Sequence, residues 1–258
     1  MARDLTPIPP LSMAATRRSN LSRIVDTLKE HYGRVAPPPA KNAFSLVLWE
    51  KVAYLADDAT RLAAFRALEA RVGLTPRDIL AADPELLREI AALGGKVGIV
   101  ERAQRMRDAA ELVLGEFDGS LDRELTRPLR EAKRSLQKIY GIGEPGAEKI
   151  LLLTRSHQVL PLDSNGARTM CRIGYGAEHK SYTTMYRSVA NAARPELVAD
   201  YAWLIDAHVL LRHHGQELCK TSQPRCESCP LTDDCSYHAI ARRSRAVRSP
   251  SARHPPSR

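Results

Sequence analysis

Between Leu136 and Leu153 the sequence reads LQKIYGIGEPGAEKILLL, and this stretch decides the fold. Apolar residues at helical spacing stand on both sides of a tight Gly141-Ile142-Gly143 turn, which is typical of two helices joined by a short connection. Glycine permits backbone conformations closed to other residues and lets the main chain approach a ligand closely. The second helix would begin near Pro145 and direct its free N–H groups at an anion.

The rest of the chain is also patterned as helices. Gly73 interrupts one apolar stripe, and the pairs Thr75-Pro76 and Asp83-Pro84 each combine an N-cap residue with a first-turn proline. No segment alternates polar and apolar residues with β-branched enrichment, so strands should be rare or absent. The sequence therefore predicts an all-α protein, and 258 residues suffice for two modest domains.

The charge of the chain is unevenly distributed. The net charge is +9, but the segment after Ile240 holds six arginines and no acidic residue, so the folded body is only mildly basic. Such a balance makes an anionic partner plausible and does not by itself identify nucleic acid. The N-terminal segment lacks the apolar run of an export signal, and no stretch is long and apolar enough to span a membrane. We expect a cytoplasmic, soluble protein.

Four of the five cysteines form a cluster with the spacing Cys219-x6-Cys226-x2-Cys229-x5-Cys235. Clustered cysteines in a reducing compartment are more often metal ligands than disulfides. Four thiolates satisfy either a [4Fe–4S] cluster, with one thiolate on each iron, or a structural zinc ion. Residue chemistry alone leaves these two alternatives open.

The cysteine spacing resembles the iron–sulfur loop that ends members of the endonuclease III and adenine-DNA glycosylase family. The stretch from Leu136 to Leu153 is similar to the helix-hairpin-helix of the same superfamily, which grips a DNA phosphate without reading sequence. The resemblance implies a [4Fe–4S] cluster on the four cysteines and double-stranded DNA as the partner. It also implies DNA contacts from the turn and from the loop after Cys219, at Gly141, Ile142, Gly143, Gly146, Lys220 and Arg225. Lys220 and Arg225 are alternatively two solvated surface cations.

After the hairpin the chain continues Leu160-Pro161-Leu162-Asp163-Ser164-Asn165 and enters another helix. The family carries its catalytic aspartate at this point, so the resemblance implies that Asp163 is catalytic. Cleavage of an N-glycosidic bond builds positive charge on the deoxyribose, which a carboxylate stabilises while it orients the attacking water. The alternative for Asp163 is a helix N-cap. Asn165 is a candidate to hold the carboxylate in position.

Bifunctional members of the family carry a nucleophilic lysine in the first turn after the hairpin, where this chain has Pro145. Lys149 lies one helical turn further on, and an ion-paired surface lysine is the alternative interpretation of it. We therefore expect a monofunctional glycosylase that uses water as its nucleophile.

The segment from Asn42 to Val52 resembles the first barrel helix of these enzymes. Glu50 stands where adenine-DNA glycosylases carry a glutamate that protonates the purine, and it is alternatively a surface glutamate. Leu55 stands near the glutamine that family members insert into the duplex, and it is either such a wedge or a core residue. Trp49 and Tyr54 are candidates for lining the base pocket or for core packing. The adjacent Asp57 and Asp58 place unexpected negative charge near DNA.

We expect two helical domains that flank a DNA cleft. The expected boundaries are a disordered extension at 1–20, a helical barrel at 43–154, an iron–sulfur domain at 21–42 and 155–238, and a disordered basic tail at 239–258. The implied function is removal of a damaged or mispaired base from duplex DNA by a monomer. The alternatives are a bifunctional glycosylase with lyase activity, and a DNA-damage or DNA-structure binding protein that has lost catalysis.

Overall fold

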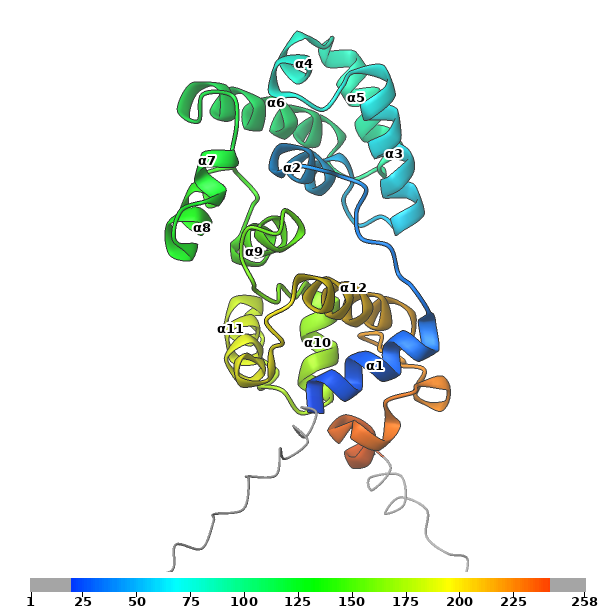
Figure 1. The fold of residues 1–258 in the computed structure, drawn as a ribbon. Helices are drawn as coiled ribbons and strands as arrows, with labels where there is room; N and C mark the ends of the chain where they lie inside the picture. The colour runs from blue at the N-terminus through cyan, green and yellow to red at the C-terminus, as the bar shows by residue number, and fades with distance from the viewer. Residues whose placement is uncertain (1–19, 242–258) are drawn as a thin grey trace, which may run out of the picture.

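The computed structural model describes residues 20–241, and every regular element in that range is helical (Figure 1). The all-α fold class predicted from the sequence is confirmed. In chain order the elements are α1 (Asn20–Tyr32), α2 (Ala43–Val52), α3 (Asp58–Arg71), α4 (Pro76–Ala81), α5 (Pro84–Leu93), α6 (Ile99–Glu116), α7 (Asp122–Leu125), α8 (Leu129–Gln137), α9 (Glu144–Leu153), α10 (Ser164–Arg172), α11 (Tyr182–Ala193), η1 (Arg194–Glu196), α12 (Tyr201–Glu217), η2 (Cys226–Ser228) and η3 (Thr232–Asp234). A further helical turn covers 236–241.

The helix boundaries follow from local capping chemistry. The Thr75 side chain accepts a hydrogen bond from the Asp78 backbone N–H, Asp78 accepts one from Thr75 in return, and Pro76 occupies the first turn of α4. Asp83 caps α5 by accepting a hydrogen bond from the Glu85 backbone N–H. The two helix starts predicted from these dipeptides are therefore confirmed, and each cap satisfies N–H groups that the helix itself leaves free.

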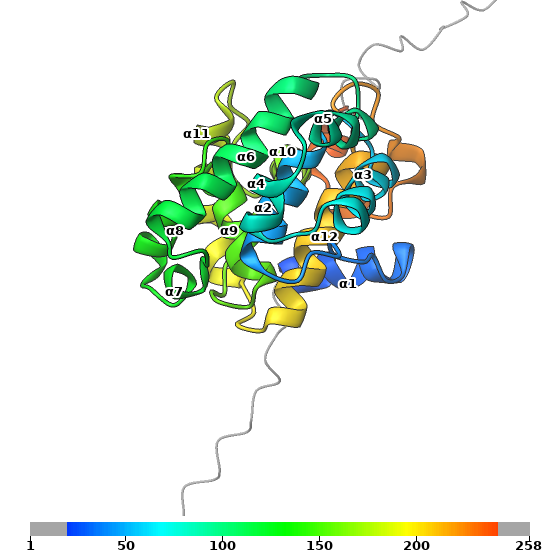
Figure 2. The same ribbon diagram turned by 90° about the horizontal axis from the view of Figure 1, so that it is seen from above.

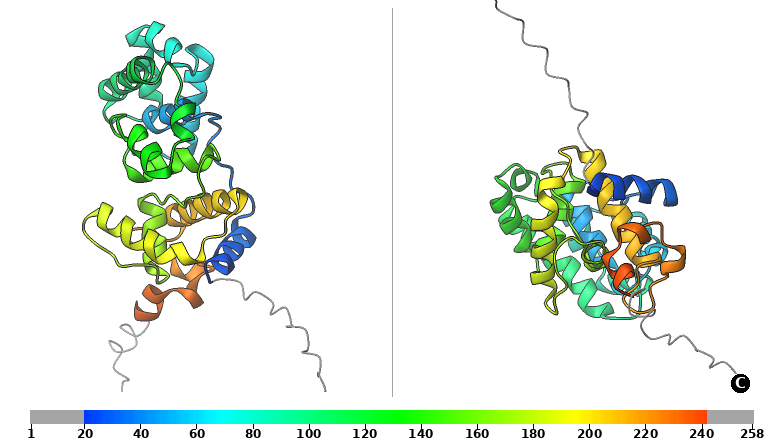
Figure 3. Two further views of the ribbon diagram at one scale, coloured as in Figure 1. Left: turned by 60° about the vertical axis from the view of Figure 1, so that its left-hand side comes forward. Right: turned by 90° about the horizontal axis from the view of Figure 1, so that it is seen from below.

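The buried apolar side chains form two clusters, and the helices divide into two lobes accordingly (Figures 1 and 3). The first lobe contains α2 to α9, and its core runs from Ala43 to Leu151. The second lobe contains α1, α10, α11 and α12, and its core includes Leu231 of the cysteine loop. Viewed from above, the first lobe lies over the second (Figure 2).

Helix α9 joins the two lobes. It contacts both α2 and α12, and it places Ile150 and Leu151 in the first core and Leu152 in the second. The hairpin that precedes α9 is therefore fixed at the junction between the lobes, because one short helix is buried on both sides.

The predicted disordered ends lie almost wholly outside the described residues. Where the two overlap, at Asn20 and at 239–241, the chain is helical. Asn20 begins α1, an amphipathic helix whose Leu21, Ile24 and Leu28 are fully buried. Among the helices described, none combines the length and apolar character needed to cross a bilayer.

Candidate active site and cysteine cavity

The predicted pair of helices around the glycine turn is present as α8, a tight connection and α9. The Ile142 N–H donates to the Ile139 carbonyl at 3.0 Å, and Gly141 has φ +82°, a left-handed conformation that favours glycine. Gly143 is the N-cap of α9 and contributes no side-chain hydrogen bond. The first turn of α9 therefore begins without a side-chain cap, as an anion-binding helix start requires.

A buried lysine holds this turn against the first lobe. The Lys51 ammonium group of α2 donates a hydrogen bond to the Tyr140 carbonyl, and the residue is only 5% exposed. Burial, with the nearby Arg105 guanidinium, lowers the pKa of Lys51 to about 8. Lys51 carried no signal in the sequence, because its partner lies 89 residues further along the chain.

Asp163 caps α10 with one carboxylate oxygen. Its Oδ1 accepts the Gly166 backbone N–H at 2.8 Å, while Oδ2 lies 3.4 Å from the Asn165 amide nitrogen and 3.3 Å from Nε of Arg212. The side chain remains 30% exposed. The capping role and a chemical role are therefore compatible, since the cap occupies only one oxygen.

The hairpin turn and Asp163 line the same cavity between the lobes, which we call the hairpin cavity. Its walls come from α2, the turn, α9, the segment before α10, α11 and α12. The lining residues are Glu50, Gly141, Ile142, Gly143, Pro145, Gly146, Lys149, Pro161, Asp163, Tyr182 and His208. Segments that are more than 150 residues apart in sequence therefore line one cavity together with the Asp163 carboxylate.

Glu50 and Lys149 face each other across this cavity as an ion pair, with 2.6 Å between Oε1 and Nζ. Burial alone would raise the pKa of Glu50, but the Lys149 ammonium, with Arg61 and Arg212, outweighs burial and holds that pKa below its usual value. Glu50 is therefore ionised near neutral pH. The predicted role as a proton donor needs the protonated form, so this environment opposes that role.

Two residues of the hairpin cavity carried no signal in the sequence. His208 is buried in α12, and its Nδ1 lies 2.8 Å from the Pro161 carbonyl oxygen. Burial, reinforced by Lys149, lowers the pKa of His208 to about 4, so the ring is neutral. The Tyr182 hydroxyl donates to the Leu162 carbonyl at 2.6 Å. Both hydrogen bonds fix the backbone that immediately precedes Asp163.

The aromatic and apolar candidates near Glu50 have different surroundings. Trp49 is 8% exposed, packs edge-to-face on Phe65 with 5.4 Å between ring centroids and is outside the lining of the hairpin cavity, which favours the core-packing alternative. Tyr54 is 56% exposed and outside the lining of the hairpin cavity. Leu55 is 80% exposed with φ +50°, which excludes the core alternative. A leucine in the left-handed region is uncommon and costs about 1 kcal/mol or more.

The two aspartates after Leu55 have local partners. Asp57 is the N-cap of α3, and its side chain accepts the Thr60 N–H. Asp58 receives both Nη groups of Arg212 from α12, with 2.7 Å between Nη1 and Oδ2. The unexpected negative charge is therefore used within the protein. Arg212, which contacts Asp58 and Asp163, is a site residue that the sequence pattern did not reveal.

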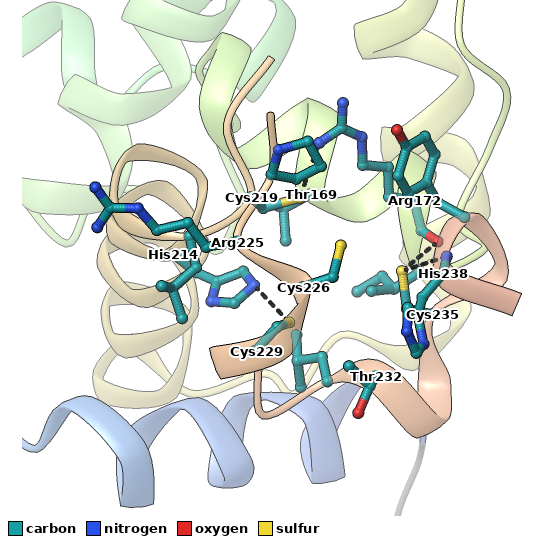
Figure 4. Close-up of a pocket in the computed structure, with 15 residues that line it drawn as sticks. Thr169, Arg172, His214, Cys219, Arg225, Cys226, Cys229, Thr232, Cys235 and His238 are labelled. Atoms are coloured by element: carbon teal, nitrogen blue, oxygen red, sulfur yellow. Dashed lines mark hydrogen bonds between the residues drawn. The ribbon is translucent and has the colours of Figure 1, made fainter. Parts of the chain in front are cut away.

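Cys219, Cys226, Cys229 and Cys235 line a second cavity, in the second lobe (Figure 4). All four are free thiols. The sulfur atoms receive polar contacts from the surrounding protein. These contacts are Arg172 Nη1 to Cys219 at 3.4 Å, His214 Nε2 to Cys229 at 3.5 Å, and the His238 N–H to Cys235 at 3.4 Å.

The four thiols also influence one another electrostatically. Burial, with the charges of the neighbouring cysteines, raises the pKa of Cys229 to about 11, and it raises that of Cys235 in the same way. Within residues 20–241, no three His, Cys, Asp or Glu side chains are grouped closely enough to hold a single metal ion. A [4Fe–4S] cluster needs its four thiolates on four separate irons, around a larger centre. The donor set fits such a group.

The two basic residues predicted to contact DNA lie beside this cavity. Lys220 is half-buried directly after Cys219, and its carbonyl oxygen accepts a hydrogen bond from Arg172 at 2.7 Å. Arg225 is exposed and borders the cysteines. Both therefore belong to the loop that carries the cysteines.

Comparisons with known proteins agree with this architecture, although no model of a protein family matches the chain. The chain is 26% identical to endonuclease III of Sulfolobus acidocaldarius over 203 residues, which is 77% of this chain and 83% of that protein. It is 29% identical over 187 residues, or 67% of its length, to DNA glycosylase/AP lyase ROS1 of Arabidopsis thaliana, of which it covers 13%.

Among solved structures, endonuclease III in a trapped covalent intermediate with DNA matches with a TM-score of 0.68 and 18% identity, over 87% of this chain and 99% of that one. The resemblance predicted from the sequence is therefore confirmed. The chain is similar in sequence to endonuclease III, and it has the fold of the helix-hairpin-helix DNA glycosylases.

Proposed function

We propose that this protein is a monomeric, monofunctional DNA glycosylase of base excision repair, which hydrolyses the N-glycosidic bond of a damaged or mispaired base in duplex DNA. One observation carries the proposal: an uncapped hairpin helix and the Asp163 carboxylate share a cavity at the junction of the two lobes. The similarity to endonuclease III supports the same class of substrate.

Each part of the hairpin cavity has a role in this proposal. The free N–H groups at Gly143 and Gly146 would receive a DNA phosphate, which fixes the register of the duplex without reading its sequence. The target base would leave the stack to reach the cavity, and the exposed Leu55 would fill the gap in the duplex. Asp163 would then stabilise positive charge on the sugar and orient the attacking water.

Glu50 enters the proposal as an ionised carboxylate paired with Lys149, and no longer as the donor of a proton to a purine. Its lowered pKa is the reason, because a general acid must hold its proton at the working pH. A pair of opposite charges beside the sugar-facing carboxylate would offer the extruded base one hydrogen-bond acceptor and one donor.

We further propose that Cys219, Cys226, Cys229 and Cys235 hold a [4Fe–4S] cluster. When bound, the cluster supplies cross-linking of the C-terminal loop rather than chemistry at the sugar. The loop residues Lys220 and Arg225 would contact DNA phosphates. The shared cavity and the spacing of the four cysteines support this assignment over a set of independent cysteines.

The proposal of a monofunctional enzyme depends on Pro145 and Lys149. Pro145 has no nucleophile, and the amine of Lys149, although it lines the hairpin cavity, is bound to the Glu50 carboxylate. A lyase needs a free amine that attacks the sugar. The bifunctional alternative therefore requires that DNA separates Lys149 from Glu50.

A panel of duplexes tests the function directly. Oligonucleotides with uracil, thymine mismatches, hypoxanthine, 8-oxoguanine pairs or oxidised pyrimidines are incubated with the protein and with Asp163→Asn, and then analysed with and without alkali. Alkali-dependent cleavage that disappears in the variant is expected. Cleavage without alkali, together with a borohydride-trapped adduct that Lys149→Gln abolishes, would establish the lyase alternative. Tight binding of a damaged duplex without product from any substrate would indicate a DNA-binding protein.

A further inference from the structure

Arg212 of α12 connects the candidate catalytic carboxylate to the opposite lobe. Its two Nη groups bind the carboxylate of Asp58, the first residue of α3, while its Nε lies 3.3 Å from Oδ2 of Asp163. Asp58 belongs to the first lobe, whereas Arg212 and Asp163 belong to the second. The side chain of Arg212 is 25% exposed, and that of Asp58 is 48% exposed.

The geometry of the guanidinium group makes this arrangement directional. The group is planar and rigid, so two-point binding of its Nη atoms by Asp58 also fixes the position of its Nε atom. Burial would lower the pKa of Arg212, but the two carboxylates outweigh burial and raise it, which keeps the group charged. Only the Nε end of the group then lies near Asp163, where it forms an ion pair at 3.3 Å.

Asp58 thereby limits how strongly Arg212 neutralises Asp163. Released from Asp58, the guanidinium could turn both Nη groups onto Asp163 and form a two-point pair with it. That pair would cancel the negative charge that a carboxylate needs in order to stabilise a cationic sugar. With Arg212 removed, Oδ2 of Asp163 would keep only the long contact to Asn165 at 3.4 Å.

We propose that Arg212 is a positioning residue for Asp163 and that Asp58, from the other lobe, sets its orientation; this inference rests on the proposed function. Asp58 orients the guanidinium group of Arg212. This group then lies beside one oxygen of Asp163 without neutralising the charge of the carboxylate. The arrangement makes the geometry of the carboxylate dependent on the fit between the two lobes. Substituting either residue is expected to slow base release by about 10- to 100-fold, the usual cost of a misplaced catalytic group.

The two substitutions are expected to move the pH dependence in opposite directions. In Asp58→Asn the freed guanidinium approaches Asp163, so the acid limb of the rate profile moves to lower pH. In Arg212→Met the carboxylate loses its cation, so the limb moves to higher pH. The remaining charged or titratable groups around Asp163 are the same in both variants. These are Glu50 of α2, Arg61 of α3, Lys149 of α9, Arg168 of α10, Tyr182 of α11 and His208 of α12.

Single-turnover base release is measured from pH 3.5 to 9, a range that includes the ordinary pKa of an aspartate. The substrate is a duplex that the wild-type protein cleaves, and binding to a duplex with an uncleavable abasic analogue is measured alongside. Both variants should bind this duplex as the wild type does. Because Asp58 acts only through Arg212, the double variant should match Arg212→Met alone. Arg212→Lys keeps the positive charge but lacks the planar guanidinium group that binds Asp58 at two points, so it should not restore the rate. Asp206→Asn, which breaks the α12 ion pair with Lys29, is the matched control and should retain the wild-type rate.

Two results would overturn the inference: wild-type rates in Asp58→Asn and Arg212→Met, or equal losses in both with an unchanged pH profile. Base release by the wild type with either result leaves the proposed function intact. NMR titration of the Asp163 carboxyl carbon, assigned with Asp163→Asn, reads the same opposite shifts without turnover. This titration therefore tests the role of Arg212 and Asp58 even if the protein releases no base.

Discussion

Lys51 offers a test of how the hairpin is held, through the pH dependence of stability. Its ammonium group is 5% exposed under the hairpin turn, and its pKa is about 8 in place of the usual 10.5. Below pH 8 both the folded and the unfolded chain carry the proton. Between pH 8 and 10.5 the unfolded chain still holds it while the folded chain has released it. Stability therefore rises with pH across this window.

The size of the effect follows from the two pKa values. The difference between 10.5 and about 8 corresponds to about 3 kcal/mol of unfolding free energy, which the wild type should gain between pH 7.5 and 10.5. Lys51→Met has no group to titrate there, so the gain should appear in the difference between the two proteins. Groups that titrate in both proteins cancel in that comparison.

Urea unfolding followed by circular dichroism at intervals from pH 7 to 10.5 measures the difference. Lys41→Met, at an exposed lysine just before α2, is the control and should track the wild type at every pH. A difference between wild type and Lys51→Met that stays flat with pH would refute the reasoning, because it would mean that the buried ammonium suffers no desolvation.

Three further substitutions test other parts of the structure. Cys229→Ser should abolish absorption near ~400 nm from the cluster and lower the unfolding free energy by several kcal/mol. The control is Cys171→Ser, at a half-buried cysteine of α10 outside the lining of the cysteine cavity, which should do neither. A protein that holds zinc instead contradicts the assignment. Leu55→Gly should raise stability by up to about 1 kcal/mol, because it relieves the left-handed leucine. It should also slow base release about tenfold if Leu55 is the wedge, with the exposed Leu93→Ala as the comparison. Pro145→Lys returns an amine to the first turn of α9 and should yield a borohydride-trapped adduct with DNA; a variant that traps nothing would show that the position alone does not confer lyase activity.

The features that sequence could predict are those encoded by neighbouring residues. Thr75-Pro76 and Asp83-Pro84 are N-caps because capping is complete within three or four residues. The glycine turn and the helix start at Asp163 were predictable for the same reason. The sequence left Trp49 between the pocket and the core, because an apolar helix gives no indication of which face turns inward: nearly all of α2 is buried.

The features that escaped prediction depend on partners far away in the sequence. Arg212 and Asp58 are 154 residues apart, Lys51 and Tyr140 are 89 apart, and His208 and Pro161 are 47 apart. An arginine or histidine inside a helix carries no local mark of such a partner, because only the packing of α12 and α2 brings the groups together. The ionised state of Glu50 is likewise a property of the assembled cavity, set by Lys149 and by two arginines of other helices.

The way in which the two lobes divide the chain has a consequence for synthesis. The first core uses a continuous segment that ends at Leu151, so it can form while the remainder is still being translated. The second core joins Leu21 and Leu28 of α1 to α12 residues as late as Leu211, so it has to wait until α12 has been made. Until then the apolar face of α1 lacks its α12 partner on the nascent protein. Aggregation and chaperone binding should therefore concentrate on that helix, and a chain truncated before α12 should keep a folded first lobe and an unfolded second one.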